Sequence, residues 1–320
     1  MNLAAPTISL VIPSYNRANL IAETLDSALA QIPPFLEVIV VDDGSTDHTA
    51  AVLASYADRI RILAGPNGGV QLARNRGVAA ARGDYIALCD SDDLLESGFV
   101  NTIGAWLRDH PECNSIYSNF VTFNEHGTDA DKFSGAPAGF FDGARRLGEF
   151  WQDIPDLYQR SLTYQPLFSS GNVVRRALYL ELGGYDSQFN GVGGEDYEFT
   201  LRVVEAGEIA LCARVLAKIR RHGSNDSTDN VRQVRGEIEI LQYALAHHRS
   251  GTQYRDAILS SIETRRLDVF NGAFARGAFD IAAPMLAQLR NPPADTKFRL
   301  KALITRLPRP LRQPLWRLTQ

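Results

Sequence analysis

Short apolar runs alternate with segments of helical periodicity through the first third of the chain. The runs Ile8–Ile12, Val38–Val41 and Tyr85–Cys89 contain almost no polar side chain, and apolar residues recur at helical spacing in Ile21–Ile32 and Val70–Ala81. Uninterrupted apolar strands are typical of parallel sheets that are buried on both faces. Strands that alternate with helices of this length indicate right-handed βαβ units. We therefore expect an α/β fold with a mixed, mainly parallel sheet flanked by helices.

The pattern changes twice along the sequence, which predicts three segments: 1–115, 116–228 and 229–320. In the second segment, Gly, Phe and Asp dominate residues 124–145, where we expect an irregular excursion. Ile209–Cys212 and Val215–Ile219 are expected to form two short strands. From Asp229 onward the periodicity is helical, and we expect a helical extension with helices over 231–248, 254–271 and 273–290.

Composition excludes several classes of protein. A net charge of −4 argues against a general nucleic-acid binder, which usually carries a basic domain. The three cysteines form no CxxC pair, which argues against a disulfide framework or a zinc site and favours a reducing compartment. The N-terminus does not resemble a signal peptide, and no apolar stretch is long enough to span a membrane. We expect a cytoplasmic location, with peripheral contact to the cytoplasmic membrane face as a second option.

Acidic side chains follow two of the expected strands. Asp42 and Asp43 come directly after the second strand, and Asp90-Ser91-Asp92-Asp93 follows the strand that ends at Cys89. Ligands bind open α/β sheets at the carboxyl ends of the strands, so these turns are expected to share one crevice. Three carboxylates in four residues repel one another unless a cation holds them, and Mg²⁺ or Mn²⁺ prefers oxygen ligands. The alternatives are a helix-capping turn at Asp42-Asp43 and a solvated acidic turn at the later cluster.

Three further elements could contribute to a site. The segment Gly65–Gly69 precedes a helix that carries Arg74, so backbone amides and a guanidinium could meet phosphates there. Glu195-Asp196 follows Gly191–Gly194, a loop that we expect to be flexible, and its carboxylates could act as a general base. His222 lies in a polar loop after a strand. The alternatives are a plain loop, an ordinary acidic helix start and a structural histidine.

Taken together and in this order, these segments resemble the family-two glycosyltransferases with the GT-A fold. The resemblance covers residues 7 to about 225, and the helical extension lies outside it. The matching stretches are Val11-Ile12-Pro13-Ser14-Tyr15-Asn16-Arg17, Val40-Val41-Asp42-Asp43-Gly44-Ser45-Thr46-Asp47, Ala73-Arg74-Asn75-Arg76-Gly77, Gly83-Asp84-Tyr85-Ile86, Asp90-Ser91-Asp92-Asp93, Gly171-Asn172-Val173-Val174-Arg175-Arg176, Gly183-Gly184-Tyr185-Asp186 and Glu195-Asp196.

The resemblance implies a Rossmann-like GT-A domain in which residues 1–115 bind the nucleotide sugar and residues 116–228 bind the acceptor. The preferred donor would be a UDP-sugar. The residues that would bind it are Pro13, Tyr15, Arg17, Asp42, Asp43, Arg74, Asp90 and Ser91. A DXD motif of Asp90 and Asp92 would hold Mn²⁺ or Mg²⁺ on the diphosphate, with Asp93 as an alternative ligand and His222 assisting.

The implied reaction is an inverting transfer to a hydroxyl of a carbohydrate or lipid-linked acceptor, as in polysaccharide or glycolipid assembly. Asp196 would deprotonate that hydroxyl, and Glu195 would orient it. A single displacement needs only one base. Two alternatives stay open. A nucleotidyltransferase that makes sugar nucleotides would carry a basic Gly-rich loop near its N-terminus, which Ser14-Tyr15-Asn16-Arg17 is not. A non-catalytic nucleotide-binding module would have no need of Asp90, Asp92 and Asp196.

The last part of the sequence is basic. Seven Lys or Arg residues and no acidic residue follow Asp295. Apolar residues alternate with them, namely Phe298, Leu300, Leu303, Ile304 and Leu307, and Trp316 lies near the end. We hypothesise that this segment lies on an anionic membrane surface. Prolines at 308, 310 and 314 should limit any helix there, and a solvated tail packed on the body is the alternative.

Overall fold

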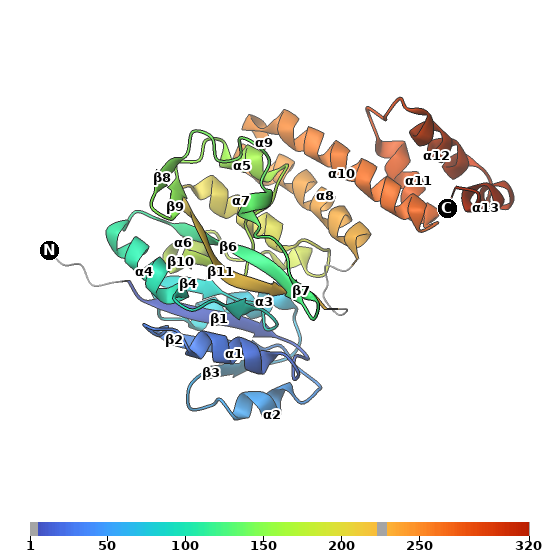
Figure 1. Cartoon of the computed structure of the whole chain (residues 1–320). Coiled ribbons are helices and arrows are strands. Elements are labelled where there is room, and N and C mark those ends of the chain that lie inside the picture. Colours follow the sequence, from blue (N-terminus) through green and yellow to red (C-terminus); the bar gives the residue numbers. More distant parts are fainter. Residues whose placement is uncertain (1–5, 223–228, 320) are drawn as a thin grey trace. The chain divides into compact units, whose positions relative to one another are not determined.

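The computed structural model describes residues 6–222 and 229–319, which form two compact units (Figure 1). The first unit comprises Met1–Asn190 and Glu198–Gly223. The second comprises Ser224–Gln320 together with the short segment Gly191–Tyr197. The chain therefore passes from the first unit to the second and back before it enters the helical extension.

The first unit is built on one mixed sheet with the strand order β3-β2-β1-β4-β10-β6-β11-β9-β8. The first four neighbours, β1 (Ile8–Ser14), β2 (Glu37–Asp42), β3 (Arg61–Ala64) and β4 (Tyr85–Leu88), are all parallel. The remaining strands are β5 (Leu94–Leu95), β6 (Ser115–Asn124), β7 (Gly127–Thr128), β8 (Arg145–Leu147), β9 (Phe150–Gln152), β10 (Asn172–Arg175) and β11 (Ile209–Arg220). The expected mainly parallel α/β sheet is confirmed.

Helices cover both faces of this sheet. The helices of the first two-thirds of the chain are α1 (Ile21–Leu29), α2 (Thr49–Ala54), α3 (Val70–Ala80), α4 (Phe99–Asp109), α5 (Leu157–Ser161), α6 (Arg176–Glu181) and α7 (Asp196–Ala206), with short 3₁₀ turns at Phe133–Gly135 and Ser187–Phe189. Leu10 and Val40 share a core cluster with Leu25 of α1. On the other face, Gly77 of α3 lies so close to Val11 that a Cβ would come within 2.3 Å of that side chain. Both faces of β1 are therefore buried, as its apolar run predicts.

The second half of the sheet differs from the sequence expectations. β10 inserts antiparallel between β4 and β6, and β6 itself is a long buried strand that the periodicity does not reveal. The two short strands expected at Ile209–Cys212 and Val215–Ile219 form one strand, β11, whose pairing with β6 shifts register at Cys212/Val215 and Val215/Ala217. These irregularities break the side-chain alternation, so one strand has the sequence pattern of two.

The strand directions bring several loops to one edge of the sheet. Since β1, β2, β3 and β4 are parallel, their carboxyl ends lie along the same edge. Two successive antiparallel pairings, through β10, make β6 parallel to β4, and β11 is parallel to β6. The carboxyl end of β11, and with it His222, therefore belongs to this edge too.

The second unit is helical. It contains α8 (Asn230–His247), α9 (Ser250–Gln253), α10 (Arg255–Ala275), α11 (Phe279–Gln288), α12 (Thr296–Arg306) and α13 (Arg309–Arg317). Its core joins Phe270 of α10 to Leu286 of α11 and Phe298 of α12. The expected helix 273–290 is divided, because α10 ends at Ala275 and Gly277, with φ of 68°, turns the chain before α11. Among the described residues, none of the helices has the length and apolar content to cross a membrane.

Candidate active site

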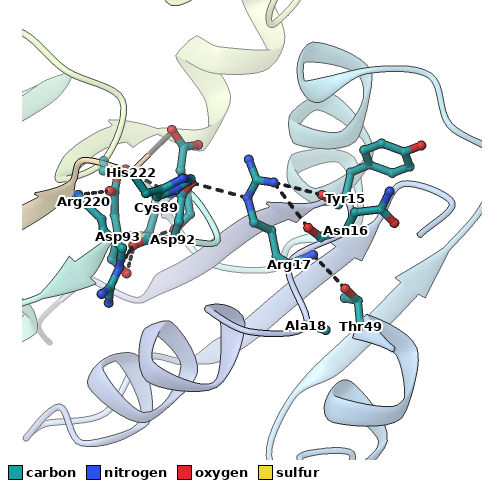
Figure 2. Close-up of polar contacts among 12 residues, drawn as sticks. Tyr15, Asn16, Arg17, Ala18, Thr49, Cys89, Asp92, Asp93, Arg220 and His222 are labelled. Carbon is teal, nitrogen blue, oxygen red and sulfur yellow. Dashed lines mark hydrogen bonds and ion pairs between the residues drawn. The ribbon is translucent and has the colours of Figure 1, made fainter. Parts of the chain in front are cut away.

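The loop after β1 is fastened to the loop after β2. Asn16 adopts a φ of 52°, and its side-chain oxygen accepts hydrogen bonds from the backbone amides of Thr46 and Asp47. The Arg17 amide donates to Thr49 Oγ1 (Figure 2). Pro13 is buried within β1, whereas the Tyr15 ring is 43% exposed at the loop surface. Of these residues, Tyr15 is thus available to stack on a ligand.

Asp42 and Asp43 are both buried and organise the backbone around them. Asp42 accepts a hydrogen bond from the Ser45 amide. Asp43 accepts hydrogen bonds from the amides of Gly68 and Gly69, at 3.0 and 2.7 Å from Oδ2. This carboxylate therefore holds the glycine-rich loop against the end of β2, a contact between loops that sequence spacing does not reveal. Whether either residue meets a nucleoside stays a prediction.

Arg74 reaches from α3 to the carboxylate cluster. Its Nη2 lies 2.6 Å from Asp90 Oδ1, and its side chain is only 4% exposed. The guanidinium carbon also lies 4.9 Å from the centre of the Tyr185 ring, a cation–π distance. The Asp90 side chain keeps 27% of its surface exposed, so Asp90 is accessible to a ligand while Arg74 is fixed behind it. Ser91, next to it, is buried.

Side chains from two distant parts of the chain contact the Asp92 carboxylate. Arg17 Nε lies 3.4 Å from Asp92 Oδ2, and His222 Nε2 lies 3.0 Å from the same oxygen. Figure 2 shows Arg17 approaching from the loop after β1 while His222 and Arg220 approach from the end of β11. Arg220 Nε also donates to the Asp92 carbonyl oxygen at 2.9 Å. The carboxyl ends of β1, β4 and β11 therefore meet at Asp92.

Asp93 is different from its two neighbours. It is buried, and its oxygens accept hydrogen bonds from Ser170 Oγ at 2.5 Å and from the Arg220 amide at 2.9 Å. Burial, together with the charges of Asp90 and Asp92, raises the pKa of Asp93 well above its usual range. These contacts favour a structural role for Asp93, joining β4, β10 and β11. Sequence reasoning missed Ser170 and Arg220, although Arg220 lies only two residues before His222.

Gln71 is a second residue that the sequence pattern does not single out. It is fully buried on α3, one turn before Arg74, and residues three apart share one side of a helix. Within the described part of the chain, neither atom of its side-chain amide has a hydrogen-bond partner. A buried amide without a partner is costly, and such groups in native proteins often serve a ligand.

Glu195 and Asp196 belong to the segment Gly191–Tyr197 of the second unit, and Asp196 is the first residue of α7. The preceding loop is held in place and is not merely flexible. Gly193 has a φ of 103°, and Gly236 of α8 comes so close that a Cβ there would lie 2.0 Å from the Gly193 oxygen. Arg232 Nη2 also donates to the Gly191 oxygen at 2.7 Å. The glycines serve close packing against α8, and the catalytic roles of Glu195 and Asp196 stay predictions.

The sequence and the fold have counterparts among known proteins. Residues 9–154, which contain β1 to β4 and the Asp90–Asp93 cluster, match the family described as Glycosyl transferase family 2. This part of the chain is thus similar to that family. The match agrees with the resemblance inferred from the motifs.

Two relatives and one solved structure illustrate the range of the family. The chain is 29% identical over 271 residues to a chondroitin synthase of Pasteurella multocida, a match that covers 83% of this chain but 26% of the synthase. It is 41% identical over 101 residues to the uncharacterized glycosyltransferase EpsJ of Bacillus subtilis, covering 31% of this chain and 29% of EpsJ. The chain thus spans about a quarter of the length of the synthase. The crystal structure of S. aureus TarS 1-349 in complex with UDP-GlcNAc superposes with a TM-score of 0.63 at 17% identity. The match covers 97% of this chain and 89% of the TarS 1-349 chain, and supports the same fold.

The residues around Asp92 include groups that could bind a divalent cation. Among residues 6–222 and 229–319, no three acidic, His or Cys side chains form a complete metal cage. Mg²⁺ and Mn²⁺ do not require one, because they commonly take one or two carboxylates and complete their shell with phosphate and water. An imidazole and a carboxylate already converge at His222 and Asp92, and Asp90 is accessible beside them. Of these groups, the carboxylates are the ligands that suit Mg²⁺ and Mn²⁺.

Proposed function

We propose that this protein is an inverting glycosyltransferase that uses a nucleoside-diphosphate sugar, with UDP as the preferred nucleotide. The observation that carries the proposal is the convergence of Arg17, Asp92 and His222 at the carboxyl edge of the sheet, with Arg74 and Asp90 beside them. This edge is where open α/β sheets bind ligands. Matching structures of TarS 1-349 are complexes with UDP and with UDP-GlcNAc, which supports the choice of UDP.

The donor is proposed to lie across the loops after β1, β2 and β4. Tyr15 would stack on the base, near Asp42 and Asp43. Arg17 would meet the phosphates, since a guanidinium can bind two phosphate oxygens at once. Arg74 would contribute to the donor site by holding Asp90 in position from behind. The unpartnered amide of Gln71 could then bind a hydroxyl of the donor.

Asp90, Asp92 and His222 are proposed to hold Mn²⁺ or Mg²⁺, with Asp93 supporting them from behind. When bound, the cation neutralises negative charge on the diphosphate leaving group. Arg17 lies within 3.4 Å of Asp92 and Arg74 within 2.6 Å of Asp90, so both carboxylates can be held in position by the chain's own cations.

Asp196 is proposed as the base, with Glu195 orienting the acceptor. The acceptor oxygen forms a bond to the anomeric carbon as that carbon's bond to the diphosphate oxygen breaks, and the acceptor proton passes to Asp196. Attack from the face opposite the leaving group inverts the anomeric centre, and one base is sufficient. Asp196 opens a helix, where a carboxylate is favourably placed with respect to the helix dipole.

The acceptor is proposed to be a carbohydrate or lipid-linked hydroxyl in polysaccharide or glycolipid assembly. Matching relatives are named chondroitin synthase and hyaluronan synthase, and both names denote polysaccharide synthesis. We also propose a cytoplasmic location, because all three cysteines are free and buried.

To test the proposal, the protein is incubated with a panel of UDP-sugars, Mn²⁺ and a mixture of acceptors. UDP release is measured, and the anomeric configuration of the product is determined by NMR. We expect one donor to give a product of inverted configuration, and to raise the melting temperature of the protein by mass action. A product of retained configuration would refute the single displacement. Synthesis of a sugar nucleotide from a nucleoside triphosphate would establish the nucleotidyltransferase alternative, and nucleotide binding without any turnover would establish a binding module.

A further inference from the structure

Five exposed leucines lie on the last two helices of the second unit. We call them the leucine face: Leu300, Leu303, Leu311, Leu315 and Leu318, with exposed fractions of 49%, 59%, 59%, 41% and 83%. Leu300 and Leu303 are three residues apart on α12, Leu311 and Leu315 are four residues apart on α13, and Leu318 is the C-cap of α13, at position i+7 from Leu311. This spacing puts each set on one side of its helix. The other large apolar side chains that are exposed are scattered along the first unit.

Other side chains of these two helices are fixed by packing. Phe298 and Ile304 are buried, and Trp316 Nε1 donates to the Phe274 oxygen at 2.7 Å. The Arg312 guanidinium lies 4.3 Å from the centre of the Phe279 ring. Phe298 and Ile304 are therefore not exposed to a membrane, and the hypothesis that this segment lies on one depends on its exposed leucines. The prolines limit the helix without excluding it: α13 has nine residues, Pro310 lies in its first turn, where a backbone N–H has no helical partner, and Pro314 lies inside it.

The leucine face is surrounded by positive charge. Exposed basic residues flank it on both helices: Lys297, Arg299, Arg306, Arg309 and Arg317. No acidic residue follows Asp295, and between described residues none of these five side chains forms an ion pair. Their charge is therefore available to an external anion.

We propose that the leucine face docks on an anionic lipid membrane, a function that goes beyond the transfer reaction itself. A membrane surface has an apolar acyl region beneath a layer of anionic headgroups. The exposed leucines can enter the acyl region while the basic side chains beside them contact the headgroups. A protein partner with an apolar groove would account for the leucines but not for unpaired charge of one sign along both helices. The contact is reversible, since it involves two short helices and not a spanning segment.

The experiment is sedimentation of the whole chain with vesicles of phosphatidylcholine alone or mixed with phosphatidylglycerol. We expect the protein to sediment with the mixed vesicles only. The triple variant Leu311→Ser/Leu315→Ser/Leu318→Ser should bind them at least about tenfold more weakly, because the apolar contribution to binding is lost. The matched control, Leu36→Ser/Leu180→Ser, removes exposed leucines of the first unit and should bind like the wild type. Nucleotide release on a soluble acceptor should be unchanged in all of these proteins.

A second variant, Arg309→Gln/Arg317→Gln, keeps the apolar residues and should lose the preference for phosphatidylglycerol. It tests the proposal even if the triple variant loses helix content by circular dichroism. Failure of the wild type to sediment with either vesicle would overturn the proposal, as would equal binding to both compositions. Self-association that the triple variant abolishes, without vesicle binding, would identify the face as an interface between copies of the chain and would likewise overturn it.

Discussion

The acidic side chains after β4 repel one another, and nearby groups reduce this repulsion. Arg74 pairs with Asp90, while Arg17 and His222 contact Asp92. Asp93 is kept protonated to higher pH by burial and by its acidic neighbours. The partners of Asp90 and Asp92 come from three different segments of the chain. The cluster can be stable in the absence of a cation and still offer oxygen ligands to one.

Asp92→Asn tests this division of roles. The amide keeps the shape of the side chain but loses the charge that would hold Mn²⁺ against the diphosphate. We expect UDP-sugar binding in Mn²⁺ to weaken by at least about tenfold, whereas binding in EDTA, already weak, should change little. Isothermal titration with and without metal measures both.

The matched control for this variant is Asp58→Asn, an exposed carboxylate in the turn before β3. It should leave both affinities as in the wild type. Equal donor binding and full turnover of the wild type in EDTA would exclude a metal role for Asp92.

Asp196→Asn separates the proposed base from the donor site. The change is nearly isosteric but removes the group that accepts the acceptor proton, so turnover should fall by roughly 10²–10⁴-fold. Donor affinity and metal dependence should stay within a few-fold of the wild type, as measured by steady-state kinetics and titration. Glu195→Gln should reduce turnover less. If Glu195→Gln abolishes turnover while Asp196→Asn does not, Glu195 is the base, and if neither matters the base lies elsewhere.

At the scale of elements, α8 supports the loop that leads to Glu195 and Asp196. A Cβ on Gly236 would lie 2.0 Å from the Gly193 oxygen and 2.8 Å from the Val192 oxygen. Alanine normally stabilises a helix relative to glycine, by roughly 0.5–1 kcal/mol. Here the methyl group must displace the loop, so local packing should outweigh the intrinsic preference of the helix.

Gly236→Ala should therefore lower kcat by up to about 10²-fold, because small displacements of a catalytic group are costly. The dissociation constant of the UDP-sugar should not change, since the donor site is proposed to lie in the first unit. Gly104→Ala in α4 is the control, as its Cβ would meet nothing within 4 Å. Normal kcat in Gly236→Ala would show that α8 does not position the base.

The elements that could be predicted are those whose signal is local. β1, β2 and α3 follow from apolar runs and helical spacing, and their sheet edge follows from strand direction. β10 and the single strand β11 could not be predicted, because antiparallel insertion and register shifts depend on partners far along the chain. For the same reason the contacts of Ser170 and Arg220 with Asp93, across 77 and 127 residues of sequence, were missed.

At the scale of the whole molecule, the chain contains separate hydrophobic cores. One joins the sheet to α1 and α4 through residues such as Leu10 and Phe99, and another joins α10, α11 and α12 through Phe270. Proteins with more than one core commonly unfold in more than one step. The nucleotide is proposed to bind the first unit, so it should stabilise only that part of the molecule.

Differential scanning calorimetry of the whole chain should resolve two transitions. UDP with Mn²⁺ should raise the melting temperature of the sheet unit and leave that of the helical unit unchanged. At 100 times the dissociation constant, the free energy of unfolding of the sheet unit should increase by about 2.7 kcal/mol. Phe270→Ala removes a buried ring from the helical core. It should lower the free energy of unfolding of the helical unit alone, by roughly 3–5 kcal/mol. Phe99→Ala, in the core of the sheet, is the matched change and should lower the nucleotide-sensitive transition instead. A single transition that moves as a whole with UDP and with either variant would mean that the two units unfold as one, and that the helical extension contributes directly to the stability of the donor-binding sheet.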